Sequence, residues 1–442
     1  MNATTGKRIV LATFGSFGDI HPYMAIATEL QRRGHQPVIA TSELYRQKMA
    51  AAGFEFIPVR PHIPPPHEQD PALMEKIMNP RSGSGFLLNE MLFPFVREGY
   101  DDLLQAVAGA DLLLTHPISF AGPLVAQKTG IPWVSSVLAP VSFFSAYDPP
   151  VPPFWLWMRH IQILGPRFVG AFFKQIKKLY SNELYAQLRN ELGLPDRGNP
   201  VFEGQHSPLL VLALFSRLFA QPQPDWPPQA RVTGFAFYDG RNEEGMPAEL
   251  TEFLDQGPAP IVFTLGTSAV WVALDFYRES IAAAKLLCRR AVLLIGDKRN
   301  RLQESLPPEI IAVDYAPFES LLGRGCVMVH HGGVGTTSQG LRVGIPTLIV
   351  PFAFDQPDNA AHAERLGTSR TLYRRQYFAN RVAKELDVLL TRPQYSQKAK
   401  EVGEHLRKER GASVACDLLE GFLMALPTRE LKSEDLTYAL SD

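Results

Sequence analysis

The 442-residue sequence predicts an α/β protein made of two doubly wound, parallel-sheet domains that face each other across a cleft. Short apolar segments alternate with amphipathic segments in both halves of the chain, as buried parallel strands alternate with helices. The intervening segment QPQPDWPP, at 221–228, is rich in proline, which is typical of a connection between domains. We therefore expect an N-terminal domain at 1–222, a linker at 223–250, a C-terminal domain at 251–425 and a polar tail at 426–442.

The first half begins with a strand, a glycine turn, a helix and a second strand. These elements are predicted, in order, by the apolar run at 8–14, GSFG at 15–18, the amphipathic pattern at 21–33 and the apolar run at 36–41. Further buried strands are expected at 54–59, 111–115 and 133–137. The first domain is therefore predicted to be built around a parallel sheet.

The second half repeats this alternation beyond the proline-rich segment. Strands are expected at 260–265, 290–295, 310–313, 327–330 and 347–350. Ligands of open parallel sheets bind beyond the carboxyl ends of the strands, so two facing sheets would hold two ligands across one crevice. That arrangement suits the transfer of a group from one bound molecule to the other.

The composition argues against several classes of function. With 44 Lys and Arg residues against 45 Asp and Glu residues, the chain has no bulk positive field to attract nucleic acid. Cys288, Cys326 and Cys416 show neither a disulfide framework nor zinc-ligand spacing. Residues 1–8 are polar, and charged residues and proline interrupt the aromatic stretch 154–173, so neither an export signal nor a membrane span is expected. These features predict a cytoplasmic protein without a bound metal.

The segment VHHGGVGTT, at 329–337, is the most informative motif. An apolar strand ends in glycines and opens a helix, which suits a phosphate group because glycines allow close approach and the first helical N–H groups point outward. His331 could donate a hydrogen bond or supply charge to a phosphate oxygen, and Thr336 and Thr337 could add hydroxyl donors. The alternative is a glycine-rich turn that only packs tightly.

A second polar motif, DQPDN, follows the last of the expected strands. Asp355 and Gln356 would lie at the same sheet edge as the glycine motif, where a carboxylate beside an amide could bind adjacent sugar hydroxyls. Asp355 could instead be a helix N-cap.

HHGGVGTT followed by DQPDNA resembles the donor signature of the inverting family 1 glycosyltransferases with the GT-B fold, in which two Rossmann-like domains face each other. The likeness begins at GSFGDIHP and continues through LGTSA, and PDWPPQARVTGFAFYDG is similar to bacterial members that glycosylate lipids, sterols and natural products, including those of rhamnolipid synthesis. The resemblance implies a hexosyltransferase that uses a UDP- or dTDP-hexose and a hydrophobic acceptor with a hydroxyl group, and no cofactor. The alternatives are a rhamnosyltransferase acting on a hydroxy-fatty-acid lipid and a non-catalytic nucleotide-sugar-binding protein.

The resemblance also implies a donor site, mainly in the C-terminal domain. Tyr315 would stack on the nucleobase and the backbone at Ala316 would pair with the edge of the base, while His331 and the glycines would line the diphosphate. The full set of predicted donor-binding residues is Gly18, Gly266, Thr267, Ser268, Tyr315, Ala316, His331, Gly333, Gly335, Thr336, Asp355 and Gln356. Tyr315 could instead be a core residue, and the turn at 266–268 could be a plain helix cap.

Family members carry the catalytic base in the first strand-to-helix loop, within a Gly-His-x-x-Pro pattern. Here the pattern runs from Gly18 to Pro22, and Asp19 stands where the family has histidine. The resemblance implies that Asp19 takes the proton of the acceptor hydroxyl in a single inverting step. His21 is the competing candidate, and Asp19 could instead only cap the helix. With Asp19 as the base no orienting partner is needed, and Asp111 is interpreted as structural.

Acceptor-binding residues are expected in the N-terminal domain, in aromatic and proline-rich loops at 61–71 and 143–157. Convergent apolar side chains beside a polar base suit an alkyl chain, a sterol or a polyketide. The predicted residues are Phe143, Phe144, Tyr147 and Trp155. Each of them could instead belong to the core. A lipid acceptor would bring the protein into peripheral contact with a membrane.

Overall fold

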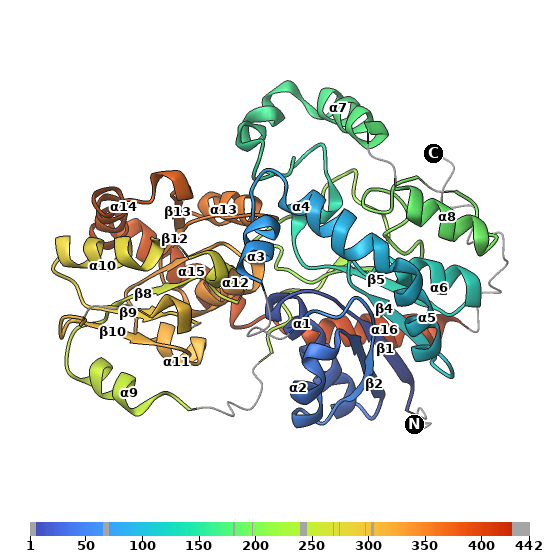
Figure 1. The fold of residues 1–442 in the computed structure, drawn as a ribbon, viewed down its shortest axis with the longest axis horizontal. Coiled ribbons are helices and arrows are strands. Elements are labelled where there is room, and N and C mark those ends of the chain that lie inside the picture. The colour runs from blue at the N-terminus through green and yellow to red at the C-terminus, as the bar shows by residue number, and fades with distance from the viewer. Residues whose placement is uncertain are drawn as a thin grey trace.

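The computed structural model describes residues 6–64, 70–179, 182–196, 198–238, 245–267, 269–273, 275–296, 298–301 and 305–426. These residues form two domains that lie side by side, each with helices around a parallel sheet (Figure 1). In spatial order the N-terminal sheet contains β3 (Glu55–Pro58), β2 (Gln36–Thr41), β1 (Arg8–Ala12), β4 (Leu112–Thr115), β5 (Trp133–Val137), β6 (Val211–Ala213) and β7 (Ala230–Val232). The predicted architecture of two doubly wound α/β domains is confirmed.

The N-terminal sheet extends further than predicted. All five strands predicted for the first half are present, but the short strands β6 and β7 were not expected. β7 pairs with β6 and lies inside the segment interpreted as the linker, so this sheet continues past residue 222. Along β1, Ile9 and Leu11 pack in one core cluster while Val10 and Ala12 pack in another, because successive side chains point to opposite faces.

The C-terminal sheet contains, in spatial order, β10 (Ile310–Val313), β9 (Ala291–Leu294), β8 (Ile261–Thr264), β11 (Val327–His330), β12 (Thr347–Ile349) and β13 (Ser369–Thr371). The five predicted strands are present. β13 was missed because its sequence, SRT, is short and polar, and it lies at the edge of the sheet, where the partner strand β12 determines its conformation.

Helices surround the two sheets, and some of them lie outside the layer that covers a sheet. In the N-terminal half they are α1 (Phe17–Arg32), α2 (Arg46–Ala51), α3 (Pro71–Ile77), α4 (Gly83–Phe86), α5 (Val96–Ala106), α6 (Ala121–Thr129), η6 (Leu156–Leu164), α7 (Pro166–Leu179) and α8 (Glu183–Glu191). In the C-terminal half they are α9 (Ala248–Asp255), η7 (Ala269–Val272), α10 (Phe276–Leu286), α11 (Phe318–Leu322), α12 (Val334–Val343), α13 (Gln356–Arg365), α14 (Ala379–Thr391), α15 (Pro393–Leu406) and α16 (Gly411–Ala425). No helix within the described ranges is both long and apolar enough to cross a membrane.

Helix α1 begins at Phe17, four residues before the periodicity predicts. Ser16 is the N-cap, and its backbone N–H donates to Oδ2 of Asp19 at 2.8 Å, which completes a capping box. Asp19 is therefore the acidic partner in the first turn rather than the N-cap itself. The hydrogen bond fixes the direction of the Asp19 carboxylate relative to the loop after β1.

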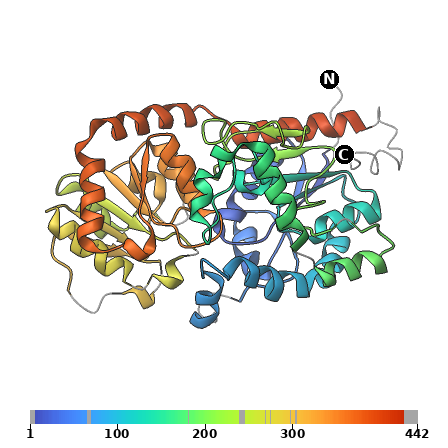
Figure 2. The ribbon, with the colours of Figure 1, turned by 90° about the horizontal axis from the view of Figure 1, so that it is seen from above.

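Helix α16 leaves the C-terminal domain and returns to the N-terminal domain, where it runs along α1 (Figure 2). Its buried face joins the core cluster beside β1 and α1, through Ala415, Cys416 and Leu419. The last segment of the described chain therefore fastens the two domains together.

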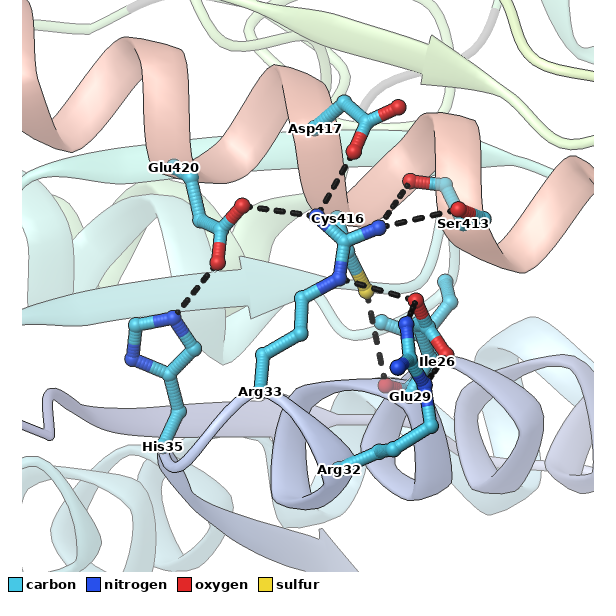
Figure 3. Close-up of polar contacts among 9 residues, drawn as sticks. All are labelled: Ile26, Glu29, Arg32, Arg33, His35, Ser413, Cys416, Asp417 and Glu420. Atoms are coloured by element: carbon cyan, nitrogen blue, oxygen red, sulfur yellow. Dashed lines mark hydrogen bonds and ion pairs between the residues drawn. The ribbon is translucent and has the colours of Figure 1, made fainter.

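One arginine connects α16 to the end of α1 (Figure 3). The Arg33 guanidinium contacts Glu29 at 2.8 Å and both Asp417 and Glu420 at 2.6 Å. His35 contacts the other oxygen of Glu420 at 2.9 Å. Hydrogen bonds from Arg32, and further ones from Arg33, lower the pKa of Glu29 to about 2, so the Glu29 carboxylate stays ionised over the ordinary pH range.

We predict that Arg33→Ala lowers the free energy of unfolding by about 2 kcal/mol, because it leaves partly buried carboxylates without their common cation. Arg32→Ala is the matched control: Arg32 contacts the same Glu29, but its side chain is 70% exposed. Urea denaturation of both variants measures the difference. Equal losses would show that Arg33 does not hold α16 in place.

Candidate active site

The predicted catalytic base, Asp19, and the glycine motif lie where helices α1 and α12 begin. β1 ends just before α1, and β11 ends just before α12. A Cβ atom built on Gly335 would lie 3.3 Å from the Cα atom of Gly18, so the first turns of the two helices touch. The motifs of the two halves of the chain, distant in sequence, therefore adjoin.

His331 lies between two glycines from separate loops. A Cβ on Gly266 would lie 2.4 Å from Cε1 of the ring, and a Cβ on Gly333 would lie 2.5 Å from Nε2. Gly266 also has a φ of +62°, which L side chains rarely adopt. The loops after β8 and β11 thus both need glycine to admit this ring.

The His331 ring is neutral in this environment. It is 4% exposed, and burial lowers its pKa to about 4. Nδ1 has no hydrogen-bond partner within the part of the chain that the structure describes. Of the two roles expected for His331, hydrogen bonding therefore suits the structure better than supplying positive charge.

Favourable electrostatics for an anion come instead from the start of α12, where the helix dipole places partial positive charge. Thr337 uses its hydroxyl to donate to the carbonyl of Gly333 at 3.0 Å, which leaves Thr336 as the hydroxyl donor of this turn. In the ranges described, no three His, Cys, Asp or Glu side chains are grouped to hold a metal ion.

Asp355 and Gln356 lie at the start of α13. Asp355 occupies the N-cap position, but its side chain accepts from Asn359 at 2.7 Å instead of capping the backbone. Gln356 accepts from the N–H groups of Phe352 and Ala353 with its carbonyl oxygen, so only its amide nitrogen is left to face a ligand. Burial, together with the charge of Asp19, raises the pKa of Asp355 to about 7.

The predicted base-binding loop follows β10. Tyr315 is 56% exposed and Ala316 is buried, so Tyr315 is not the core residue of the alternative interpretation. Thr267 is exposed beside Gly266. Ser268, also predicted to contact the donor, lies outside the described residues.

Both oxygens of the Asp19 carboxylate have polar neighbours, and Oδ2 accepts two hydrogen bonds. The N–H and the hydroxyl of Ser16 donate to Oδ2 at 2.8 and 3.1 Å. Nε2 of His116 lies 3.4 Å from Oδ1. The Asp19 side chain is 31% exposed against 6% for His116, so the carboxylate is the member of this pair that a ligand can reach.

His116 was missed in the sequence. It follows directly after β4, and its Nδ1 accepts from the N–H of Ile118 at 3.2 Å, which assigns the proton of the neutral ring to Nε2, the nitrogen that faces Asp19. The sequence interpretation did not require a partner for Asp19, and the structure places His116 beside it. A histidine at the end of a buried strand was the available signal, but the sequence does not reveal that β4 pairs with β1.

Two other candidates lie away from Asp19. Asp111 contacts Lys7 at 2.9 Å and accepts from the N–H of Arg8, at the opposite edge of the sheet, in agreement with the structural interpretation. His21 stacks on Phe17 with ring centroids 5.2 Å apart and has a pKa lowered to about 4 by burial. Residues two apart on a helix point to different sides, which explains the separation of His21 from Asp19.

The aromatic residues expected to bind the acceptor are not one group. Phe143 stacks on Trp226 at 4.2 Å in a core cluster, as the alternative interpretation anticipates. Phe144 meets Phe202 edge to face, Trp155 packs against Phe172 in a small separate cluster, and Tyr147 is 47% exposed.

A small pocket that the sequence did not reveal adjoins the pair formed by Asp19 and His116. Thr13 lines it and donates its hydroxyl to the Asp19 carbonyl at 3.1 Å, and Ile118 lines it next to His116. The other walls are mostly apolar and include Phe14, Val59, Leu92, Phe95, Val96 and Phe120. Thr13 and Ile118 connect this pocket to the pair, whose own side chains are not among the lining residues.

Several known protein families and proteins are similar to this chain. Two family models match: the glycosyltransferase family 28 N-terminal domain over residues 9–90, and the erythromycin biosynthesis protein CIII-like C-terminal domain over residues 280–420. O-mycaminosyltylonolide 6-deoxyallosyltransferase from Streptomyces fradiae is 30% identical over 432 residues, which cover 93% of this chain and 97% of that protein. A sterol 3-beta-glucosyltransferase from Neurospora crassa is 28% identical over 92% of this chain, which spans 27% of that longer protein.

Solved structures show the same fold. The glycosyltransferase of kitacinnamycin superposes with a TM-score of 0.69 at 21% identity, covering 95% of this chain and 99% of that one. The spinosyn rhamnosyltransferase SpnG, complexed with thymidine diphosphate, gives a TM-score of 0.64 at 17% identity, covering 94% of this chain and 100% of that one.

We predict that Gly333→Ala weakens the binding of UDP or dTDP about tenfold, the cost of roughly one hydrogen bond, because the new methyl group displaces the His331 ring. Gly333 has a φ of −58°, which any residue adopts, so the backbone is not strained. Isothermal titration calorimetry measures the affinity. Gly421→Ala, where a Cβ meets nothing within 4 Å, is the control. Unchanged affinity in Gly333→Ala would remove His331 from the phosphate site.

The raised pKa of Asp355 predicts a pH-dependent stability. Between about pH 4 and pH 7 the folded protein keeps a proton that the unfolded chain releases, so Asp355 costs stability progressively as the pH rises through this range. The gain from Asp355→Asn should be larger at pH 8 than at pH 5 by roughly 2 kcal/mol. Urea denaturation at both pH values tests this, with the exposed Asp387→Asn as the control. The same gain at both values would contradict it.

Proposed function

This chain belongs to the glycosyltransferases with the GT-B fold, and we propose that it transfers a hexose from a UDP- or dTDP-sugar to a hydroxyl group of a hydrophobic natural product or sterol, with inversion at the anomeric carbon. The observation that carries the proposal is the contact between the first turns of α1 and α12, at Gly18 and Gly335. It brings a carboxylate that could act as a base next to a glycine-rich helix start that could bind a diphosphate. The thymidine diphosphate in the SpnG structure supports a dTDP-sugar as one candidate donor.

In the proposed reaction, Asp19 takes the proton of the acceptor hydroxyl as that oxygen forms a bond to the anomeric carbon of the sugar. The bond between this carbon and the diphosphate oxygen breaks on the opposite face, and its electron pair leaves with the diphosphate. N–H groups at the start of α12, the Thr336 hydroxyl and the neutral His331 ring stabilise the developing negative charge. Tyr315 stacks on the nucleobase of the donor, and Asp355 and Gln356 bind the sugar hydroxyls.

His116 acts through Asp19 and is a positioning residue. Its Nε2–H faces Oδ1 while Ser16 holds Oδ2, so the carboxylate is restrained from two sides. The apolar pocket beside Thr13 and Ile118 is the proposed acceptor subsite, because it adjoins both members of the pair. An acceptor placed there would present its hydroxyl to the exposed part of Asp19.

The test is nucleoside diphosphate release with UDP- and dTDP-hexoses and a panel of macrolide and sterol acceptors. We predict acceptor-dependent release that falls by about 10²–10⁴-fold in Asp19→Asn, since the amide cannot accept the proton. Donor affinity should be unchanged in this variant. Tight donor binding by the native protein, without release for any acceptor, would indicate a binding protein instead.

His116 variants separate orientation from general structure. His116→Gln keeps an N–H donor and should retain more of kcat than His116→Leu, which has none, while KM for the donor stays the same in both. Equal losses in the two variants, or a loss of thermal stability that parallels the loss of kcat, would assign His116 a structural role only.

A further inference from the structure

A helical hairpin protrudes from the N-terminal domain. It comprises residues 154–178, with η6 and α7 packed against each other across Gly165. Figure 1 shows α7 at the upper edge of the molecule, outside the helices that cover the sheet, and Figure 2 shows the same green segment facing the viewer. A small cluster that includes Met158, Ile161, Val169 and Phe173 forms its own core.

The hairpin and the turn before it expose an unusual amount of apolar surface. Six of the twelve large hydrophobic side chains that are exposed in the described chain fall between residues 147 and 168: Tyr147, Phe154, Trp157, Ile163, Leu164 and Phe168. Ile163 is the most exposed of the twelve, at 82%. Ile163, Leu164 and Phe168 flank Gly165, so the turn of the hairpin is an apolar tip. Such a concentration on one segment marks an interaction site.

The charge of this segment differs from that of the whole protein. Residues 149–182 are 34 consecutive positions without Asp or Glu, although they contain five Lys or Arg residues and the whole chain has a net charge of −1. Arg167, Lys174, Lys177 and Lys178 form no ion pair with any carboxylate in the part of the chain that is described. The surface is therefore cationic as well as apolar.

Helical geometry separates the apolar and cationic groups of α7. Arg167, Lys174 and Lys178 are spaced by seven and four residues and share one face. Val169 and Phe173 are buried and belong to the opposite face, which packs on the hairpin core. The basic face of α7 therefore points outward, and the apolar tip lies at its N-terminal end.

We propose that the hairpin docks on an anionic membrane surface. Ile163, Leu164 and Phe168 enter the boundary between headgroups and acyl chains, and Arg167, Lys174 and Lys178 contact anionic headgroups. An apolar edge beside a lysine-rich face without carboxylates is the composition of helices that lie at the bilayer interface. Charge complementarity favours an anionic lipid surface over a protein partner or a second copy of this chain.

Contacts join the hairpin region to helix α13, which begins beside Asp355. Asp358 accepts from the N–H of Val151 at 3.0 Å, and Arg365 contacts Asp148 at 2.9 Å. Arg159 of the hairpin lies 3.5 Å from Glu364. A docked hairpin would hold the proposed active site near the membrane, where apolar acceptors partition. The idea that docking supplies an acceptor to the site rests on the proposed transferase function. The docking of the hairpin on a membrane does not depend on that function.

The test is co-sedimentation of the full chain with vesicles of phosphatidylcholine alone or with about 30% phosphatidylglycerol. We expect binding to the anionic vesicles only, weakened by added salt. Ile163→Ser/Leu164→Ser and Lys174→Glu/Lys178→Glu should each lower the partition coefficient at least about tenfold. Turnover of a water-soluble acceptor should be unchanged in both, so failure of docking and failure of the transferase proposal give different results.

Matched controls use equally exposed residues elsewhere. Leu286→Ser/Met424→Ser removes exposed apolar side chains, and Lys384→Glu/Lys400→Glu reverses exposed charges, without touching the hairpin. Both should bind vesicles like the native protein. The proposal is overturned by equal binding to neutral and anionic vesicles, by no binding, or by equal losses in hairpin and control variants. A dimer that Ile163→Ser/Leu164→Ser converts to a monomer, without vesicle binding, would assign the hairpin to a second copy instead.

Discussion

The contact between Gly18 and Gly335 is the constraint on which the candidate site depends. The starts of α1 and α12 meet so closely that a Cβ atom on Gly335 would lie 3.3 Å from the Cα atom of Gly18, and a side chain at Gly335 would press on the other helix. The contact brings the partial positive charge at the start of α12 to the same place as the Asp19 carboxylate. Neither domain alone contains both features, so the geometry of the domain interface determines the chemistry available.

Helix α13 and helix α16 maintain this interface from different sides. α13 offers Asp355 and Gln356 at its start, and farther along it contacts the N-terminal half through Asp358, His362 and Arg365. α16 begins beside the C-terminal domain and ends in the core beside α1, held by Arg33. A change in the angle between the domains would therefore disturb ionic and hydrogen-bonded contacts at both places. The positions of the sugar-binding residues and the stability of the interface are thereby linked.

The sequence predicts the class of fold and the motifs well, because both are local. Apolar runs indicate most of the strands. Glycines before a helix indicate a phosphate site, whatever the rest of the fold is. The short strands β6, β7 and β13 escape prediction because their partners, not their own composition, hold them in the sheet. The proximity of His116 to Asp19 is not predicted for a related reason. It depends on the pairing of β4 with β1, two strands that are far apart in the sequence. The acceptor residues stay a prediction, because aromatic composition does not distinguish the core packing of Phe143 from the exposure of Tyr147.

The pair formed by Asp19 and His116 gives a physical reason why aspartate can stand where related enzymes have histidine. The family that the sequence resembles has histidine at this helix start, whereas here the aspartate lies at the helix start and the histidine of the pair follows the later strand β4. An imidazole and a carboxylate therefore lie together beside the proposed donor site. What changes is the group that faces the acceptor. Because Asp19 is partly exposed and His116 is buried, the proton would pass to a carboxylate flanked by Ser16 and His116, and the buried imidazole would stabilise the orientation of the carboxylate without meeting the substrate.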